Sequence, residues 1–240
     1  MNEIVRLDIA NGVARIQMDD GGKNLVSPLM LSQLNAALDQ AERQNAIVVL
    51  TGREDVFSAG FDLNILRSGV SQTYTMLMGG FKLARRLLSF KTPVIVACNG
   101  HAIAMGAFIL LSGDYRIGVS GDFKIVANEV EIGLAVPYSM LEVCRQRLSP
   151  GALSRASLLS EQQTPETAME VGFFDQLVTP DQLEQEGDKA IERFKKLDFT
   201  SHYQSKLRLR KQALSAIDKG LRKDKIDFVK QGFNRLLKRR

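Results

Sequence analysis

Two short apolar runs, each closed by glycine, most restrict the fold of this chain of 240 residues. They are residues 47–52 (IVVLTG) and 93–100 (PVIVACNG), and each precedes small residues and then a helical pattern. Runs of this length and composition are typical of strands that are buried on both faces. Further strands are expected at 115–119, 123–126 and 174–178, and Asn11-Gly12 predicts a hairpin turn between two alternating segments. The pattern therefore predicts an α/β fold of repeated strand–strand–helix units.

The last quarter of the chain differs from the rest. Beyond residue 180 no strand pattern is evident, and the sequence is charged and amphipathic. We expect a core domain over residues 1–195 and a C-terminal helical module over 196–240. An amphipathic helix at 201–240 cannot bury its apolar face alone, so we expect it to pack on the body or on another subunit.

The net charge of +5 comes from the C-terminal end. Residues 221–240 hold eight basic and two acidic side chains, a surplus of six that exceeds the charge of the whole chain by one. This distribution argues against nucleic-acid binding by the whole domain. It is compatible with a local contact to an anion or with a solvated helix face.

Several kinds of chemistry lack their motifs. His101 and His202 have no Cys, Asp or Glu at metal-ligand spacing, so no metal site is expected. There is no nucleophile elbow, dinucleotide fingerprint or phosphate-binding loop. The two cysteines, Cys98 and Cys144, lie in apolar surroundings, which favours a reducing, cytoplasmic location. No signal-peptide pattern and no apolar stretch of about 20 residues is present, so no membrane contact is expected.

The loops that follow the two apolar runs could bind a developing negative charge. Residues 57–63 (FSAGFDL) and 99–107 (NGHAIAMGA) each join a strand to a helix through small residues. Such a junction leaves main-chain N–H groups unpaired at the helix start. Two of these groups aimed at one point would hold a carbonyl oxygen as it becomes an oxyanion.

These loops, with three further segments, resemble the crotonase (enoyl-CoA hydratase/isomerase) superfamily. The matching segments are 57–63, 91–102 (KTPVIVACNGHA), 113–117 (GDYRI), 128–134 (NEVEIGL) and 168–175 (AMEVGFFD). The resemblance covers about residues 4–200 and implies a crotonase-like spiral of ββα units. It also implies an acyl-CoA thioester substrate, no separate cofactor, and a homotrimer or hexamer built through the helical module.

The resemblance assigns roles to particular residues. Phe61 and Met105 would supply the two main-chain N–H donors of the oxyanion hole. Met105 departs from the family's usual run of Gly or Ala at that place. Backbone groups of Ser58, Ala59 and Gly60 would bind coenzyme A, and the basic C-terminal end is compatible with its phosphates. Phe108 and Tyr138 are expected to line the acyl pocket.

The carboxylates distinguish the reactions. Hydratases of the family use two glutamates, and the first of these positions falls on Phe108, which cannot transfer a proton. The second falls on Glu129, and this single-glutamate pattern resembles the Δ3-Δ2-enoyl-CoA isomerases of the family. Burial should raise the pKa of Glu129. Either Glu131 or Glu142 could supply a second carboxylate and restore hydration.

The favoured hypothesis is therefore an enoyl-CoA isomerase of acyl-CoA metabolism with Glu129 as its base. The first alternative is an enoyl-CoA hydratase that uses Glu129 with Glu131 or Glu142. Other thioester chemistry on the same scaffold, such as hydrolysis, stays open because a fold does not fix a reaction. An alternative of another class is a catalytically weak protein that binds acyl-CoA or, through the basic end, RNA.

Overall fold

The computed structural model describes residues 3–68 and 70–237. Strands and helices alternate up to residue 178, and only helices follow in the described part. The strands are β1 (Val5–Ala10), β2 (Val13–Met18), β3 (Ile47–Thr51), β4 (Asp55–Ser58), β5 (Val94–Cys98), β6 (Gly100–Ile103), β7 (Tyr115–Val119), β8 (Ile125–Val126) and β9 (Gln176–Val178). The α-helices are α1 (Pro28–Arg43), α2 (Leu63–Ser68), α3 (Val70–Leu88), α4 (Met105–Leu111), α5 (Tyr138–Arg145), α6 (Pro150–Leu159), α7 (Pro165–Val171), α8 (Leu183–Phe194), α9 (Phe199–Leu209) and α10 (Lys211–Leu237), with a 3-10 turn at Pro180–Gln182.

The main sheet has six strands in the order β1-β2-β3-β5-β7-β9. β1 and β2 form an antiparallel hairpin, and the other neighbours are parallel. The hairpin turn is the predicted Asn11-Gly12, and both residues have positive φ, 51° and 76°. Two-residue turns with positive φ at both positions match the twist of the strands they join, and Gly12 adopts that conformation without strain.

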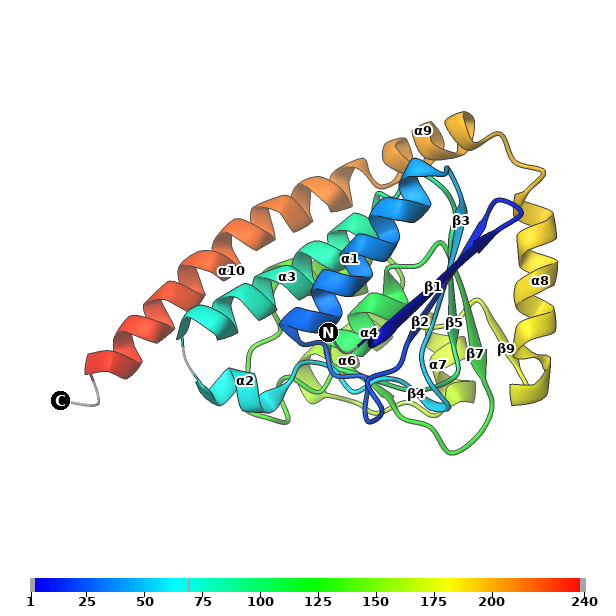
Figure 1. Ribbon diagram of the computed structural model, residues 1–240. Coiled ribbons are helices and arrows are strands. Elements are labelled where there is room, and N and C mark those ends of the chain that lie inside the picture. Colours follow the sequence, from blue (N-terminus) through cyan, green and yellow to red (C-terminus); the bar gives the residue numbers. More distant parts are fainter. Residues whose placement is uncertain (1–2, 69, 238–240) are drawn as a thin grey trace.

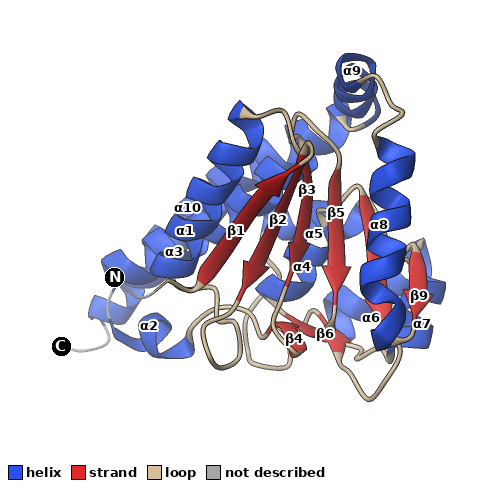
Figure 2. Ribbon diagram, turned by 45° about the vertical axis from the view of Figure 1, so that its right-hand side comes forward, coloured by secondary structure: helices blue, strands red, loops and turns tan. Residues whose placement is uncertain are grey.

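A second sheet, β4-β6-β8, lies beside one end of the first (Figure 2). Its first two strands fall in the segments that the sequence pattern predicted as loops, and the predicted strand at 123–126 is only Ile125–Val126. These strands have two to four residues, and β4 contains a serine and β6 a glycine. They are too short to show an alternating pattern. Their pairing is what holds the two glycine-bearing segments together.

Helices cover both faces of the main sheet. α1, α3, α4, α5 and α10 lie on one face, and α8 lies on the other (Figures 1 and 2). The larger apolar core fills the first side, and a smaller core under α8 includes Ile47, Ile95 and Ile117. None of the described helices has the length and apolar character needed to cross a membrane.

The C-terminal helices pack on the body. α10 runs along α3 and α5, and its Leu214 and Ile217 belong to the larger core. α9 is capped by the preceding residue, Asp198, whose side chain accepts a hydrogen bond from the Ser201 N–H. The helical end is therefore covered in part by its own chain. The expected boundary between residues 195 and 196 stays a prediction, and residues 238–240 of that module lie outside the described part.

A buried ion cluster fixes these helices to the ends of the inner strands β5 and β7 of the main sheet. Asp114, between α4 and β7, lies 2.6 Å from Lys206 Nζ and 2.9 Å from Arg210 Nη1. Burial alone would raise the pKa of Asp114, but His202, Lys206 and Arg210 together hold it well below its usual range. Lys206 Nζ also donates to the carbonyls of Phe90 and Thr92, so its charge is fully satisfied.

Candidate active site

The two glycine-bearing segments meet because β4 and β6 pair in parallel. Val56 is opposite His101, and Ser58 is opposite Ala102. Just beyond this pair, Gly60 has φ +86°, and a Cβ atom there would lie 2.9 Å from the Ile103 carbonyl oxygen and 3.3 Å from the Met105 nitrogen. Glycine is needed at position 60 for both its conformation and the close approach. The chain around Phe61 and the start of α4 therefore touch.

Two main-chain N–H groups are unpaired at this contact. Met105 is the first residue of α4, where an N–H has no partner inside the helix. In the described part of the chain, neither the Phe61 nor the Met105 amide donates a hydrogen bond. The preceding residue, Ala104, has φ +50° and ψ −119°, a conformation that costs free energy for any residue with a Cβ. Such strain is common where a backbone group must be aimed at a ligand.

Glu129 lies in the turn that follows β8 and is only 7% exposed. Burial raises the pKa of Glu129 to about 7, and a backbone hydrogen bond opposes this effect only in part. Its Oε2 atom is buried and has no hydrogen-bond partner in the described part. Such a carboxyl can accept and release a proton near neutral pH, as a general base must.

Glu129 lines a cavity of about 460 Å³ that also reaches the two glycine-bearing segments. Most of the wall is apolar, and its last part comes from α10. The lining residues are Ala59, Phe61, Leu63, Leu66, Leu77, Met78, Phe81, Ile103, Ala104, Asn128, Glu129, Ile132, Leu134, Ala135, Val136, Pro137, Tyr138, Leu141, Asp224, Asp227 and Phe228. An apolar cavity with few polar groups is typical of a site for a small molecule or an acyl chain.

The structure brings some of the predicted site residues together and leaves others aside. Glu129, Phe61, Ala59 and Tyr138 line the cavity, and Met105 directly follows two lining residues. The Ser58 side chain does not reach the cavity, because its hydroxyl donates to the Asn24 carbonyl at 2.7 Å and is buried.

Phe108 lies elsewhere than predicted. We expected it to line the acyl pocket, but its ring is 1% exposed in the apolar core and is not part of the cavity wall. The reason is its place in α4, all of whose residues are buried beneath the sheet.

The two glutamates proposed as second carboxylates are also outside the cavity. Glu131 is exposed, and Glu142 lies on α5 with its carboxylate 3.3 Å from Arg145. Neither lines the cavity.

The family resemblance placed the C-terminal module near the coenzyme A site, but no sequence pattern singled out the residues that α10 contributes to the cavity wall. Asp224 is 8% exposed and accepts hydrogen bonds from the N–H groups of Tyr138 and Ser139 at 2.7 and 3.0 Å. It also accepts from the Ser139 hydroxyl. A carboxylate at this place caps the start of α5. The spacing of Asp224, Asp227 and Phe228 shows that they share one helix face, but sequence alone cannot say what that face meets.

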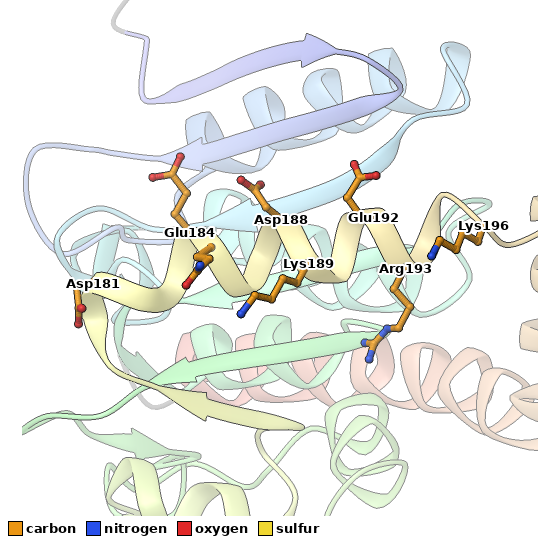
Figure 3. A pocket seen from close by; sticks show the side chains of 8 residues that line it. Asp181, Glu184, Asp188, Lys189, Glu192, Arg193 and Lys196 are labelled. Carbon is orange, nitrogen blue, oxygen red and sulfur yellow. The ribbon is translucent and has the colours of Figure 1, made fainter.

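A second hollow, of about 730 Å³, lies along α8 on the opposite side of the sheet (Figure 3). Its lining is polar and of mixed charge, and it comes from α8, the turn before it and Lys196 just after it. Several of these side chains are already paired, such as Asp188 with Arg15 and Glu192 with Lys195. No buried, unpartnered polar atom of the described residues lies there, so we do not treat this hollow as a site.

The histidines are used in the packing of the fold. His101 accepts from the Lys124 N–H through Nδ1, and His202 lies beside Asp114 in the ion cluster. Within residues 3–68 and 70–237 we find no group of three or more His, Cys, Asp or Glu side chains arranged to bind a metal ion.

Comparisons with known proteins agree with this architecture. Residues 8–240 match the model of the enoyl-CoA hydratase/isomerase family. The chain is 26% identical over 222 residues to the human mitochondrial enoyl-CoA delta isomerase 1, covering 89% of this chain and 72% of that one.

Solved structures of similar proteins have the same fold. A protein from Mycobacterium tuberculosis, named an enoyl-CoA isomerase in one structure and a probable enoyl-CoA hydratase in another, has in the first a TM-score of 0.89 and 42% identity, covering 93% of this chain and 98% of that one. An enoyl-CoA hydratase from Mycobacterium marinum has a TM-score of 0.90 and 40% identity, covering 94% and 100%. The chain therefore belongs to the enoyl-CoA hydratase/isomerase family and has the crotonase fold. The enzymes of this family act on acyl-CoA thioesters.

Proposed function

We propose that this protein is an enoyl-CoA isomerase that moves a double bond from the Δ3 to the Δ2 position, with Glu129 as its single base. The supporting observation is the Glu129 carboxyl itself. It is buried in an apolar cavity, has a pKa of about 7, and has an oxygen without a partner in the described part of the chain. Relatives named as isomerases and as hydratases resemble the chain to a similar degree, so only the geometry around Glu129 favours one reaction over the other.

The reaction needs one group that removes a proton and returns it. The thioester oxygen accepts hydrogen bonds from the Phe61 and Met105 amides. Glu129 takes a proton from C2, and the electron pair of that C–H bond moves into a dienolate whose charge lies on the thioester oxygen. The protonated Glu129 then delivers the proton to C4, which leaves a C2–C3 double bond and restores the carboxylate. No redox step occurs, and no separate cofactor takes part.

Hydration by the two-glutamate route has less support. That route needs a second carboxylate beside Glu129, and neither Glu131 nor Glu142 lines the cavity. Asp224 does line it, but its oxygens already accept hydrogen bonds at the start of α5. The proposal has three further parts. The backbone of residues 58–60 binds coenzyme A, the protein assembles into a trimer or hexamer, and it is located in the cytoplasm.

The test compares Glu129→Gln with Glu131→Gln on purified 3-enoyl-CoA, following the conjugated 2-enoyl product. We expect Glu129→Gln to lose about 10²- to 10⁴-fold in kcat, the usual contribution of a general base. Glu131→Gln, at an exposed neighbouring carboxylate, should match the original protein. Isomerisation that survives Glu129→Gln, or that the original protein does not perform, would refute the proposal.

A further inference from the structure

Gly80, in the interior of α3, lies where the side chains of Phe61 and Met105 meet. A Cβ atom at position 80 would lie 2.6 Å from both Cε1 and Cζ of the Phe61 ring and 3.2 Å from Met105 Sδ. Carbon atoms in favourable contact are about 3.5–4.0 Å apart, so this place has room for a hydrogen atom but not for a methyl group. The two residues that carry the proposed oxyanion donors therefore pack against one point of one helix.

The helix itself gives no reason for a glycine at this place. Position 80 is inside α3 and away from both ends, where glycine is among the least favourable residues, and Gly80 has no positive φ that would require it. A buried glycine inside a helix usually has a packing reason. The neighbouring Gly79 differs, because a Cβ atom there would meet only the flexible end of the Leu31 side chain, at 2.9 Å from Cδ1.

Both side chains that contact Gly80 are held by their surroundings. The Phe61 ring packs edge to face on Phe81, with 5.9 Å between the ring centroids and 73° between the ring planes. Met105 is fully buried, and the cavity wall formed by the described residues does not include it. The long Met105 side chain can turn away from the cavity because Gly80 leaves space for its sulfur atom. A displacement of either side chain would shift the backbone that carries the amide.

We propose that Gly80 is a positioning residue that sets the spacing of the Phe61 and Met105 amides through the side chains of these two residues. The inference rests on the oxyanion-hole role that the proposed function gives to the two amides. Gly80 is outside the cavity wall that the described residues form, so it acts without touching the substrate. Hydrogen bonds to a developing oxyanion stabilise the transition state more than the bound substrate. An error in donor spacing therefore lowers kcat more than it raises KM.

The kinetic test compares Gly80→Ala with Gly79→Ala, which add the same methyl group at adjacent positions of α3, in the isomerisation of 3-enoyl-CoA. We expect Gly80→Ala to lower kcat by about tenfold, as a misplaced donor does, with KM within about twofold of the original value. Gly79→Ala should keep both constants, since the end of the Leu31 side chain can move aside. A folded Gly80→Ala protein with unchanged kcat overturns the inference. So does a rise in KM alone, because the methyl group would then only narrow the cavity.

A rescue variant shows whether the methyl group acts through Phe61. Phe61→Leu removes both ring atoms that the methyl group would meet and keeps the main-chain amide. In the Phe61→Leu background, adding Gly80→Ala should change kcat by less than about twofold, because the two sites are coupled through this contact. A tenfold loss in both backgrounds overturns the inference. If Gly80→Ala alone does not fold, the double variant decides: a kcat equal to that of Phe61→Leu supports the inference, and a lower one overturns it.

A binding experiment separates this inference from the proposed isomerase activity. Acetoacetyl-CoA forms an enolate that places negative charge on the thioester oxygen and absorbs in the near ultraviolet, so titration at that band measures binding of the charged form. We expect Gly80→Ala to weaken enolate binding by about tenfold and to change the calorimetric affinity for uncharged butyryl-CoA by less than about twofold. Gly79→Ala should change neither. An equal loss for both ligands, or no enolate band in the original protein, overturns the role of Gly80. A loss confined to the enolate, in a protein that does not isomerise 3-enoyl-CoA, overturns only the proposed function.

Discussion

The Ala104 amide donates a hydrogen bond to the Val126 carbonyl at 2.8 Å. This bond joins the residue before Met105 to the last residue of β8, three positions before Glu129. The base and one proposed oxyanion donor are therefore attached to the same small sheet, and β4 of that sheet leads to Phe61, the other donor. A rigid element that carries all three groups can hold them in place without substrate, which is the condition for electrostatic stabilisation of a transition state.

The first prediction concerns Gly60. A methyl group at position 60 would lie within 3.0 Å of the Ile103 carbonyl and the Ala104 Cβ, and the backbone there has φ +86°. We expect Gly60→Ala to push the Phe61 and Met105 amides apart and to lower kcat by about 10²- to 10³-fold, the usual effect of a lost oxyanion donor. Steady-state kinetics on 3-enoyl-CoA would measure this.

The control for that variant is Gly187→Ala on α8, where an added methyl group would contact nothing. It should keep full activity. Because Gly60→Ala also strains the chain, its melting temperature should be measured alongside. A folded Gly60→Ala protein with unchanged kcat would mean that these amides do not serve catalysis.

The second prediction is the pH dependence of the reaction. Glu129 acts as a base only when ionised, and burial raises its pKa to about 7. The value of kcat/KM should therefore be constant well above pH 7 and should fall about tenfold for each pH unit well below it. A profile measured from pH 5 to 9 tests this. An acidic limb centred near the ordinary glutamate value of 4.5 would contradict the assignment of Glu129 as the base.

The third prediction is a gain in stability when Glu129 is neutralised. Its pKa is raised in the folded protein, so the folded state binds the proton more tightly than the unfolded state. The cost of the buried charge is then absent below about pH 4.5 and fully present above about pH 7. The difference between these values corresponds to about 3 kcal/mol as an upper estimate. Glu129→Gln should exceed the original protein in free energy of unfolding by up to that amount at pH 8, with little difference at pH 4.

Denaturant unfolding at the two pH values checks this, with Glu131→Gln as the control that should show no such pH-dependent gain. A Glu129→Gln protein that is less stable at pH 8 would show that the carboxylate has a partner or open water in the folded state. A Glu129→Gln protein that is more stable but less active is what we expect if the buried carboxylate destabilises the fold and is needed for the reaction.

Much of this fold could be predicted from local sequence patterns. Ile47–Thr51 and Val94–Cys98 are strands because each is a short apolar run that ends near glycine, and Pro165–Val171 is a helix with the expected proline at its start. The five segments of the family resemblance also led to the crotonase fold. Each of these features depends on residues that are close together in the sequence, so a local sequence pattern is enough to predict it.

The features that were missed depend on contacts between distant residues. β4 and β6 have four residues each, too few for a periodic signal, and they form because they pair with one another. Phe108 was expected in the pocket, but the packing of α4 buries all of its residues in the core, and none of them lines the cavity. No sequence pattern predicted that Asn128 lines the cavity, because only the turn after β8 places it in the same cavity as Glu129.

The last prediction concerns Asp224, through which α10 holds the far wall of the cavity. Its carboxylate accepts three hydrogen bonds from Tyr138 and Ser139 at the start of α5, so Asp224→Ala leaves buried donors unpaired. We expect a loss of about 2–3 kcal/mol in the free energy of unfolding, in the range for a lost helix cap and charged hydrogen bonds. KM should rise several-fold, because Tyr138 and the neighbouring Pro137 line the cavity. Asp224→Asn keeps one acceptor and should lie between the two proteins, whereas Asp122→Ala, at an exposed bend, should change neither quantity. If Asp224→Ala loses stability while KM stays constant, the start of α5 does not shape the substrate site.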